Sequence, residues 1–140
     1  MSDPHDLQRF VTAQAAVYDD VLEELGAGRK TSHWMWFVFP QIQGLGSSPM
    51  AARYAIASID EARAYLDHPV LGTRLRQCSD LVLQANGRTA EQIFGNPDVM
   101  KLRSSMTLFD RASGDEGNPF GRVLERHYDG KRDEATLARL

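Results

Sequence analysis

Residues 33–41 read HWMWFVFPQ, and the fold class depends on how this stretch folds. Its apolar part, residues 34–39, is the one segment of the chain whose aromatic and β-branched content suits a buried β-strand. It also suits a short buried helix, because Ser32 can cap its start and Pro40 closes it. A run this short does not separate the two by periodicity. We favour the helix, and the expected fold class is then mainly α.

Proline positions on either side of this stretch indicate where helices begin. Proline suits the first helical position because its missing N–H would have no partner there. Asp, Ser and Asn before it can accept a hydrogen bond from a free backbone N–H of the first turn. Five prolines follow a polar residue and precede a helical pattern: Asp3-Pro4, Ser48-Pro49, His68-Pro69, Asn96-Pro97 and Asn118-Pro119.

Other helices are indicated by apolar spacing and by caps. Apolar residues from Leu7 to Leu25 recur at three-to-four spacing and predict one long first helix. Ser58 and Thr89 begin capping patterns, and a last helix is expected near Asp133. We therefore expect one compact domain, residues 1–140, with about six to eight short helices.

Length and composition exclude several classes of protein. The chain has 140 residues, 42% hydrophobic and 25% charged, which fits one folded domain. A net charge of −3 argues against a dedicated nucleic-acid-binding protein, which carries a basic stripe. No apolar run approaches the ~18–20 residues that span a membrane, and the polar N-terminus does not resemble a signal peptide. We expect a cytoplasmic protein whose partners include neither a membrane nor a nucleic-acid polymer.

Cysteine and histidine content gives little support for a metal centre. Cys78 is the one cysteine, so the chain contains no internal disulfide. The four histidines are scattered and show neither HxxxH nor HExxH spacing. We expect no metal site and no cofactor.

The segment from Gly28 to Pro49 is the densest source of candidate binding residues. An indole face can stack a flat ring, a lysine can meet phosphate charge, and a Gly-rich turn before a helix presents N–H groups to an anion. The segment therefore has the composition of a pocket for a flat, anionic ligand. Its candidate ligand-binding residues are Lys30, Trp34, Trp36, Gln41, Ser47 and Ser48, with His33 as an orienting group or proton carrier.

A structural role stays open for each of these residues. Aromatic clusters in small helical domains more often form the core, and lysines in loops are more often solvated. Ser48 has the position of a helix cap. The sequence GLGSS at 44–48 matches neither a Walker loop nor a dinucleotide fingerprint.

A second group of candidates follows Pro97. Asp98, Lys101 and Ser105 are spaced three and four apart, so they share one face of the expected helix. Asp98 is the best available acid, Lys101 can hold phosphate, and Ser105 can add a hydroxyl to the same wall. The alternative is a surface ion pair between Asp98 and Lys101, with Ser105 merely tolerated.

Residues 33–41, the glycines at 44 and 46, and the stretch KLRSSMTLF at 101–109 resemble domain-of-unknown-function family 1810. The resemblance extends from the first expected helix to Tyr128. Members are small bacterial and fungal proteins, sometimes labelled calpastatin-like. Calpastatin repeats are disordered inhibitors, whereas this chain has the composition of a folded domain, so the label implies no function here.

The stretches TSHW at 31–34 and SSPMAAR at 47–53 are similar to parts of the NADAR superfamily, which contains the protein YbiA. This similarity implies a compact helical protein, an ADP-ribose-like ligand and cleavage of an N-glycosidic bond. The NADAR run has a Glu before its His, where this chain has Ser32. Such cleavage needs a carboxylate. Either another acid such as Asp98 supplies it here, or the protein binds its ligand without cleaving the N-glycosidic bond.

Two functional hypotheses result. In the first, a cleft binds a small anionic nucleotide or ADP-ribose-like ligand, with or without N-glycosidic cleavage by Asp98 and His33. In the second, the chain is a non-enzymatic protein-interaction module whose aromatic residues are structural. The module should expose an apolar patch of several hundred Å². The ligand-binding protein should instead gather Lys, Asp and His in one concave pocket.

Overall fold

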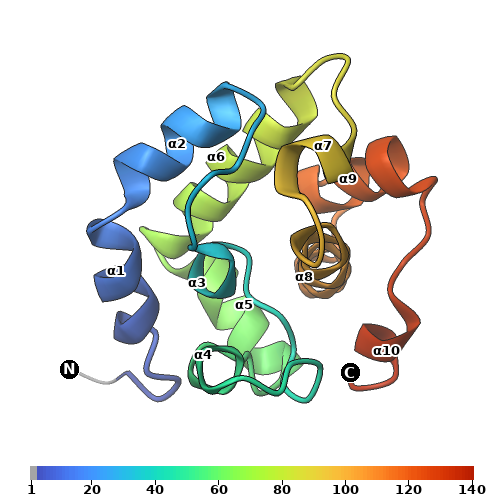
Figure 1. The fold of residues 1–140 in the computed structure, drawn as a ribbon. Helices are drawn as coiled ribbons and strands as arrows, with labels where there is room; N and C mark the ends of the chain where they lie inside the picture. Colours follow the sequence, from blue (N-terminus) through green and yellow to red (C-terminus); the bar gives the residue numbers. More distant parts are fainter. Residues whose placement is uncertain (1–2) are drawn as a thin grey trace.

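The structure is a computed structural model that describes residues 3–140. Within this range the chain forms ten α-helices and no β-strand, which confirms the mainly α fold class (Figure 1). The helices are α1 (Gln8–Ala15), α2 (Tyr18–Gly26), α3 (Met35–Val38), α4 (Pro49–Arg53), α5 (Ile59–Asp67), α6 (Leu71–Gln84), α7 (Ala90–Phe94), α8 (Asp98–Ser113), α9 (Pro119–Tyr128) and α10 (Glu134–Leu137).

The aromatic run folds as a helix, α3, rather than as a strand. Its backbone hydrogen bonds are local, because the N–H of Val38 donates to the carbonyl of Trp34 and that of Phe39 to Met35. A buried strand would need a neighbouring strand to accept these bonds. The one β-type pairing in the described residues is an isolated bridge between Ile42 and Ile56.

The long first helix expected from Leu7 to Leu25 is divided in two, which is a correction to the sequence prediction. The helical geometry is interrupted at Val17, where φ is −128° and ψ is 0°. The interruption turns the chain so that α1 packs against α3 while α2 packs against α6. This split and several one-turn helices account for the excess over the expected six to eight.

Caps place several helix starts where the sequence predicts them. Helices α4 and α9 begin at a proline, and their N-caps are Ser48 and Asn118. Helix α6 differs, because it begins at Leu71 rather than at Pro69. There the His68 Nδ1 accepts the N–H of Leu71 at 3.2 Å, so the imidazole does the work of a capping side chain.

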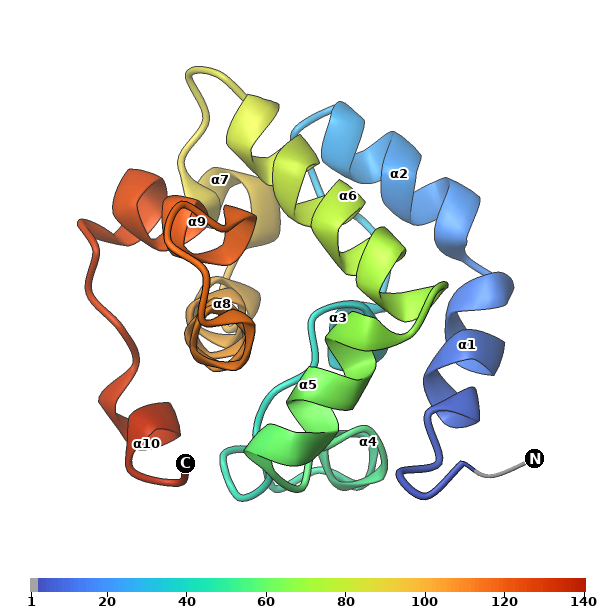
Figure 2. The same ribbon diagram turned by 180° about the vertical axis from the view of Figure 1, so that it is seen from behind.

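Helix α8 is the centre of the fold. Figures 1 and 2 place α1 and α2 at one edge of the molecule and α9 and α10 at the opposite edge, with α8 between. Tyr65 of α5 and Phe120 of α9 stack against Phe109 of α8, with ring centres 5.2 and 5.9 Å away. All three rings are fully buried, so they bind these helices into one hydrophobic core.

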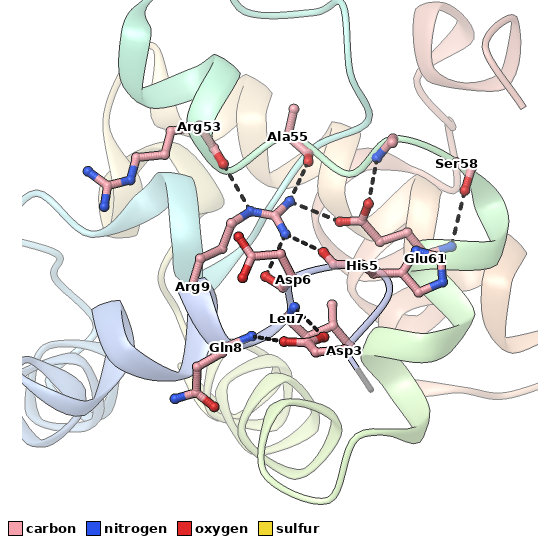
Figure 3. A network of polar contacts seen from close by, with 11 residues as sticks. Asp3, His5, Asp6, Leu7, Gln8, Arg9, Arg53, Ala55, Ser58 and Glu61 are labelled. Carbon is pink, nitrogen blue, oxygen red and sulfur yellow. Dashed lines mark hydrogen bonds and ion pairs between the residues drawn. The ribbon is translucent and has the colours of Figure 1, made fainter. Parts of the chain in front are cut away.

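A polar network fixes the segment that follows α4 (Figure 3). Arg9 of α1 donates to the carbonyls of Arg53 and Ala55, each at 2.9 Å. The same guanidinium pairs with Glu61 of α5 at 3.0 Å, where the Glu61 side chain is 5% exposed. Three separate parts of the chain are therefore held by one arginine.

Candidate functional site

One pocket gathers five of the predicted site residues from two distant parts of the chain. It lies between the loop that precedes α3, α3 itself and the first turn of α8, and its volume is about 440 Å³. We call it the Lys101 pocket. Its lining residues are Lys30, Thr31, Ser32, His33, Met35, Trp36, Phe94, Asn96, Pro97, Asp98 and Lys101.

The two lysines of the Lys101 pocket have different surroundings. Lys30 Nζ lies 2.8 Å from Asp98 Oδ2, and its side chain is 7% exposed. Lys101 Nζ is 3.8 Å from Asp98 Oδ1, and its side chain is 26% exposed. Lys30 therefore forms a close ion pair with Asp98, and Lys101 is the ammonium group that a ligand can reach.

The two tryptophans also differ. Trp34 is 1% exposed, and its ring packs against Phe39 and Phe94. Trp36 is half-buried and lines the pocket, with Lys101 Nζ 5.3 Å from the centre of its ring. A stacking role is thus open to Trp36, whereas Trp34 belongs to the core beneath the pocket.

Glu24 of α2 holds the loop that forms one wall of the pocket. Its Oε1 accepts the backbone N–H of Thr31 at 2.7 Å and of Ser32 at 2.9 Å, and the Trp34 Nε1–H at 3.1 Å. Burial raises the pKa of the Glu24 carboxyl, but these hydrogen bonds lower it by more, so it lies below its ordinary value of 4.5. A carboxylate therefore does lie beside Ser32, supplied by another helix.

Sequence reasoning did not predict this role for Glu24. On the amphipathic pattern of the first helix it is one of several acidic residues on the polar side. Its partners are seven to ten positions away, a separation that no local capping motif covers.

A second pocket, which we call the Tyr54 pocket, adjoins the first at Trp36. Its volume is about 260 Å³. Gln41 lines this pocket and not the Lys101 pocket. The lining residues are Trp36, Gln41, Ile42, Gln43, Gly44, Gly46, Ala51, Ala52, Tyr54 and Ala55.

Besides Trp34, three predicted binding residues lie outside both pockets. Ser47 and Ser48 are exposed, and Ser48 Oγ accepts the N–H of Ala51 at 3.1 Å as the cap of α4. Ser105 is fully buried one turn beyond Lys101, and its hydroxyl has no hydrogen-bond partner among residues 3–140. The helix face of Asp98 and Lys101 therefore reaches the pocket, but its continuation to Ser105 enters the interior.

The described residues contain neither a metal-binding cluster nor a membrane-spanning helix. Residues 3–140 contain no group of three or more His, Cys, Asp or Glu side chains that could hold a metal ion. In the same range, no helix has the length and apolar character needed to cross a membrane.

Fold and site together define a small α-helical protein with a charged pocket that a half-buried indole lines. Residues 4–140 match the family described as "Protein of unknown function (DUF1810)", and the chain belongs to this family. A similar solved structure is the conserved hypothetical protein Rv1873 from Mycobacterium tuberculosis, which is 58% identical. The TM-score is 0.95, and the alignment covers 99% of this chain and 98% of that one. A comparison with curated proteins found no match.

Proposed function

We propose that the Lys101 pocket binds a small anionic ligand with a flat ring, of the nucleotide or ADP-ribose type. The observation that carries this proposal is the position of the Lys101 ammonium over the Trp36 indole inside one pocket. An ammonium group binds phosphate and an indole stacks a planar ring, so both parts of a nucleotide find a partner. The volume of about 440 Å³ lies within the roughly 300–1,000 Å³ of small-molecule sites.

The charges of the pocket favour an anion. Two ammonium groups, Lys30 and Lys101, face the single carboxylate of Asp98. Because Lys30 holds Asp98 at the shorter distance, the excess positive charge lies on the Lys101 side. His33 lines the same pocket and adds a second nitrogen group that can donate to phosphate.

The same pocket contains the groups that N-glycosidic cleavage requires. Asp98 supplies a carboxylate that can stabilise a cationic sugar carbon, and His33 supplies an imidazole that can carry a proton. In that reaction water bonds to the sugar carbon as the carbon–nitrogen bond breaks. The proton that water loses goes to the leaving adenine of ADP-ribose, or to solvent when nicotinamide leaves NAD, because the nicotinamide ring nitrogen of NAD is already cationic. Release of a free base from NAD or ADP-ribose, followed by chromatography, tests this part of the proposal.

The alternative, a protein-interaction module, has less support from the surface. Among the large hydrophobic residues of the described chain, Met100 and Leu140 are the exposed ones. Single exposed apolar residues are normal on a monomeric protein and do not form an interface. The convergence of Lys, Asp and His in one concavity is the arrangement expected of a ligand site.

Thermal unfolding of the purified protein against a ligand panel tests the binding proposal. The panel contains AMP, GMP, ADP-ribose, NAD and riboflavin precursors, with inorganic phosphate as the control for simple anion effects. A ligand at ~100 times its Kd adds ~2.7 kcal/mol to the free energy of unfolding, which raises Tm by several degrees. We expect at least one nucleotide to raise Tm more than phosphate does. A panel without any such shift, with the protein folded, would contradict the proposal and favour the interaction module.

A further inference from the structure

The indole of Trp36 separates two pockets of different chemistry. It lines both the Lys101 pocket and the Tyr54 pocket. The Lys101 ammonium lies over one face of this ring, 5.3 Å from its centre. Because Trp36 belongs to both linings, a ligand bound beside it can reach the Lys101 pocket with one part and the Tyr54 pocket with another.

The Tyr54 pocket is lined by uncharged residues. None of its lining residues is Asp, Glu, Lys, Arg or His. The amides of Gln41 and Gln43 each offer donors and an acceptor, which is the mixture that the edge of a nucleobase needs. Arg139 donates to the carbonyl of Gly44 at 3.2 Å but is not a lining residue, so the pocket itself offers hydrogen bonds and aromatic contact to an uncharged heterocycle.

Two glycines of this pocket allow close approaches that a side chain would prevent. Gly44 has φ +99°, a conformation that L side chains rarely adopt. At Gly46 an added Cβ would meet the Cβ of Ala51 at 2.5 Å, so the turn and α4 approach closely. This wall is therefore closely packed, and the Gly44 carbonyl accepts a hydrogen bond from Arg139 Nη2 at 3.2 Å.

The rigidity and size of the pocket suit one ring. Tyr54 is 6% exposed, and its ring packs against Phe10 and Phe37. The carbonyls of Arg53 and Ala55 on either side of it are held by Arg9 (Figure 3). The volume of about 260 Å³ falls below the roughly 300–1,000 Å³ of complete ligand sites, so the pocket holds part of a ligand.

We infer that the Tyr54 pocket is the base-recognising half of the site and takes the uncharged ring of a nucleotide whose phosphate lies at Lys101. The inference rests on the proposed function and narrows the class of ligand. The ligand must carry a base and a phosphate on one molecule, with one group in each of the two pockets that Trp36 lines. A sugar phosphate without a base satisfies only the Lys101 half.

A variant that fills the Tyr54 pocket tests base binding separately from phosphate binding at Lys101. Ala52 is exposed on α4 and lines the pocket, so Ala52→Phe places a ring in it without disturbing the core. The matched control is Ala15→Phe, at an exposed alanine of α1 that lines neither pocket. Calorimetry measures the affinity of wild type and both variants for AMP and GMP, each compared with ribose 5-phosphate.

We expect wild type and Ala15→Phe to bind at least one of the two nucleotides ten times or more tighter than ribose 5-phosphate. In Ala52→Phe this preference should fall at least tenfold, while the affinity for ribose 5-phosphate stays the same. An unchanged preference in Ala52→Phe would overturn the base pocket and leave the proposed function standing. Absence of nucleotide binding in wild type would overturn both.

Discussion

The ammonium of Lys101 in α8 lies 5.3 Å from the ring centre of Trp36 in α3, and this contact joins the two parts of the candidate site. A cation over an aromatic face gains ~0.5–1 kcal/mol at an exposed position. The ring positions the ammonium but does not neutralise it, because its own charge distribution is only a quadrupole. Lys101 is therefore held at the mouth of the pocket with its charge available to an anion.

The ion pair between Lys30 and Asp98 should respond unequally to removal of its two members. Asp98→Asn leaves the Lys30 ammonium, 7% exposed, without its carboxylate. Lys30→Met leaves the Asp98 carboxylate without Lys30, but the Asp98 side chain is already 18% exposed and still has Lys101 nearby. Loss of one partner of a buried pair costs ~3–5 kcal/mol, and we expect Asp98→Asn to approach the lower end and Lys30→Met to lose less. Urea unfolding measures both; a larger loss for Lys30→Met would show that the buried ammonium does not depend on Asp98.

Glu24 should make part of the stability dependent on acid pH. Its pKa is lowered in the folded protein, so its contribution is present above the ordinary value of 4.5 and is lost as pH falls through the folded-state pKa. Glu24→Gln retains an acceptor but loses the charge, and we expect it to be about 1 kcal/mol less stable than wild type at pH 7. The difference should shrink steadily below pH 4.5. A difference that is the same at pH 7 and pH 3 would contradict the role of the charge.

Arg9 should be among the most sensitive polar residues of the fold. Arg9→Met leaves Glu61, 5% exposed, without its cation and frees the carbonyls that Arg9 holds (Figure 3). We expect a loss of ~3–5 kcal/mol in the free energy of unfolding, measured in urea. The double variant Arg9→Met with Glu61→Met removes the buried charge as well and should lose no more than the single one. Additive losses from the two changes would rule out coupling between the residues.

Two helical glycines provide a matched test of packing. An added Cβ at Gly72 of α6 would lie 2.0 Å from the carbonyl oxygen of Leu66, where α5 ends and α6 begins. At Gly26, the last residue of α2, the same Cβ would meet nothing within 4 Å. Gly72→Ala should cost ~1–3 kcal/mol or more, whereas Gly26→Ala should add roughly 0.5–1 kcal/mol. Thermal unfolding of both variants checks this, and a neutral Gly72→Ala would show that the two helices can separate without loss.

Local signals in the sequence predict much of the fold. The caps at Ser48, Asn118 and Asp133 appear where expected, and Thr89 forms the predicted capping box. These features depend on residues within one turn of each other, which the sequence displays directly. The break at Val17 was not predictable in this way, because it serves packing against α3 and α6, which are distant in the chain.

The candidate site, like the fold, was predictable from the sequence only in part. Lys30, His33, Trp36, Asp98 and Lys101 are recognisable by residue type, and the structure brings them to one pocket. Whether a given side chain lines the pocket depends on burial, which distinguishes Trp36 from Trp34 although the two lie only two positions apart in the same aromatic run. The Tyr54 pocket has no charged group and no motif, so only the three-dimensional arrangement reveals it.

Binding of AMP and GMP to the Lys101→Met variant tests the central proposal most directly. The control is Lys131→Met, because Lys131 is exposed and lines neither pocket. We predict that Lys101→Met weakens the affinity of the bound nucleotide at least tenfold, or about 1.4 kcal/mol, while Lys131→Met leaves it unchanged. Equal affinities in wild type and Lys101→Met, with both proteins folded, would contradict the assignment of this pocket as a nucleotide site.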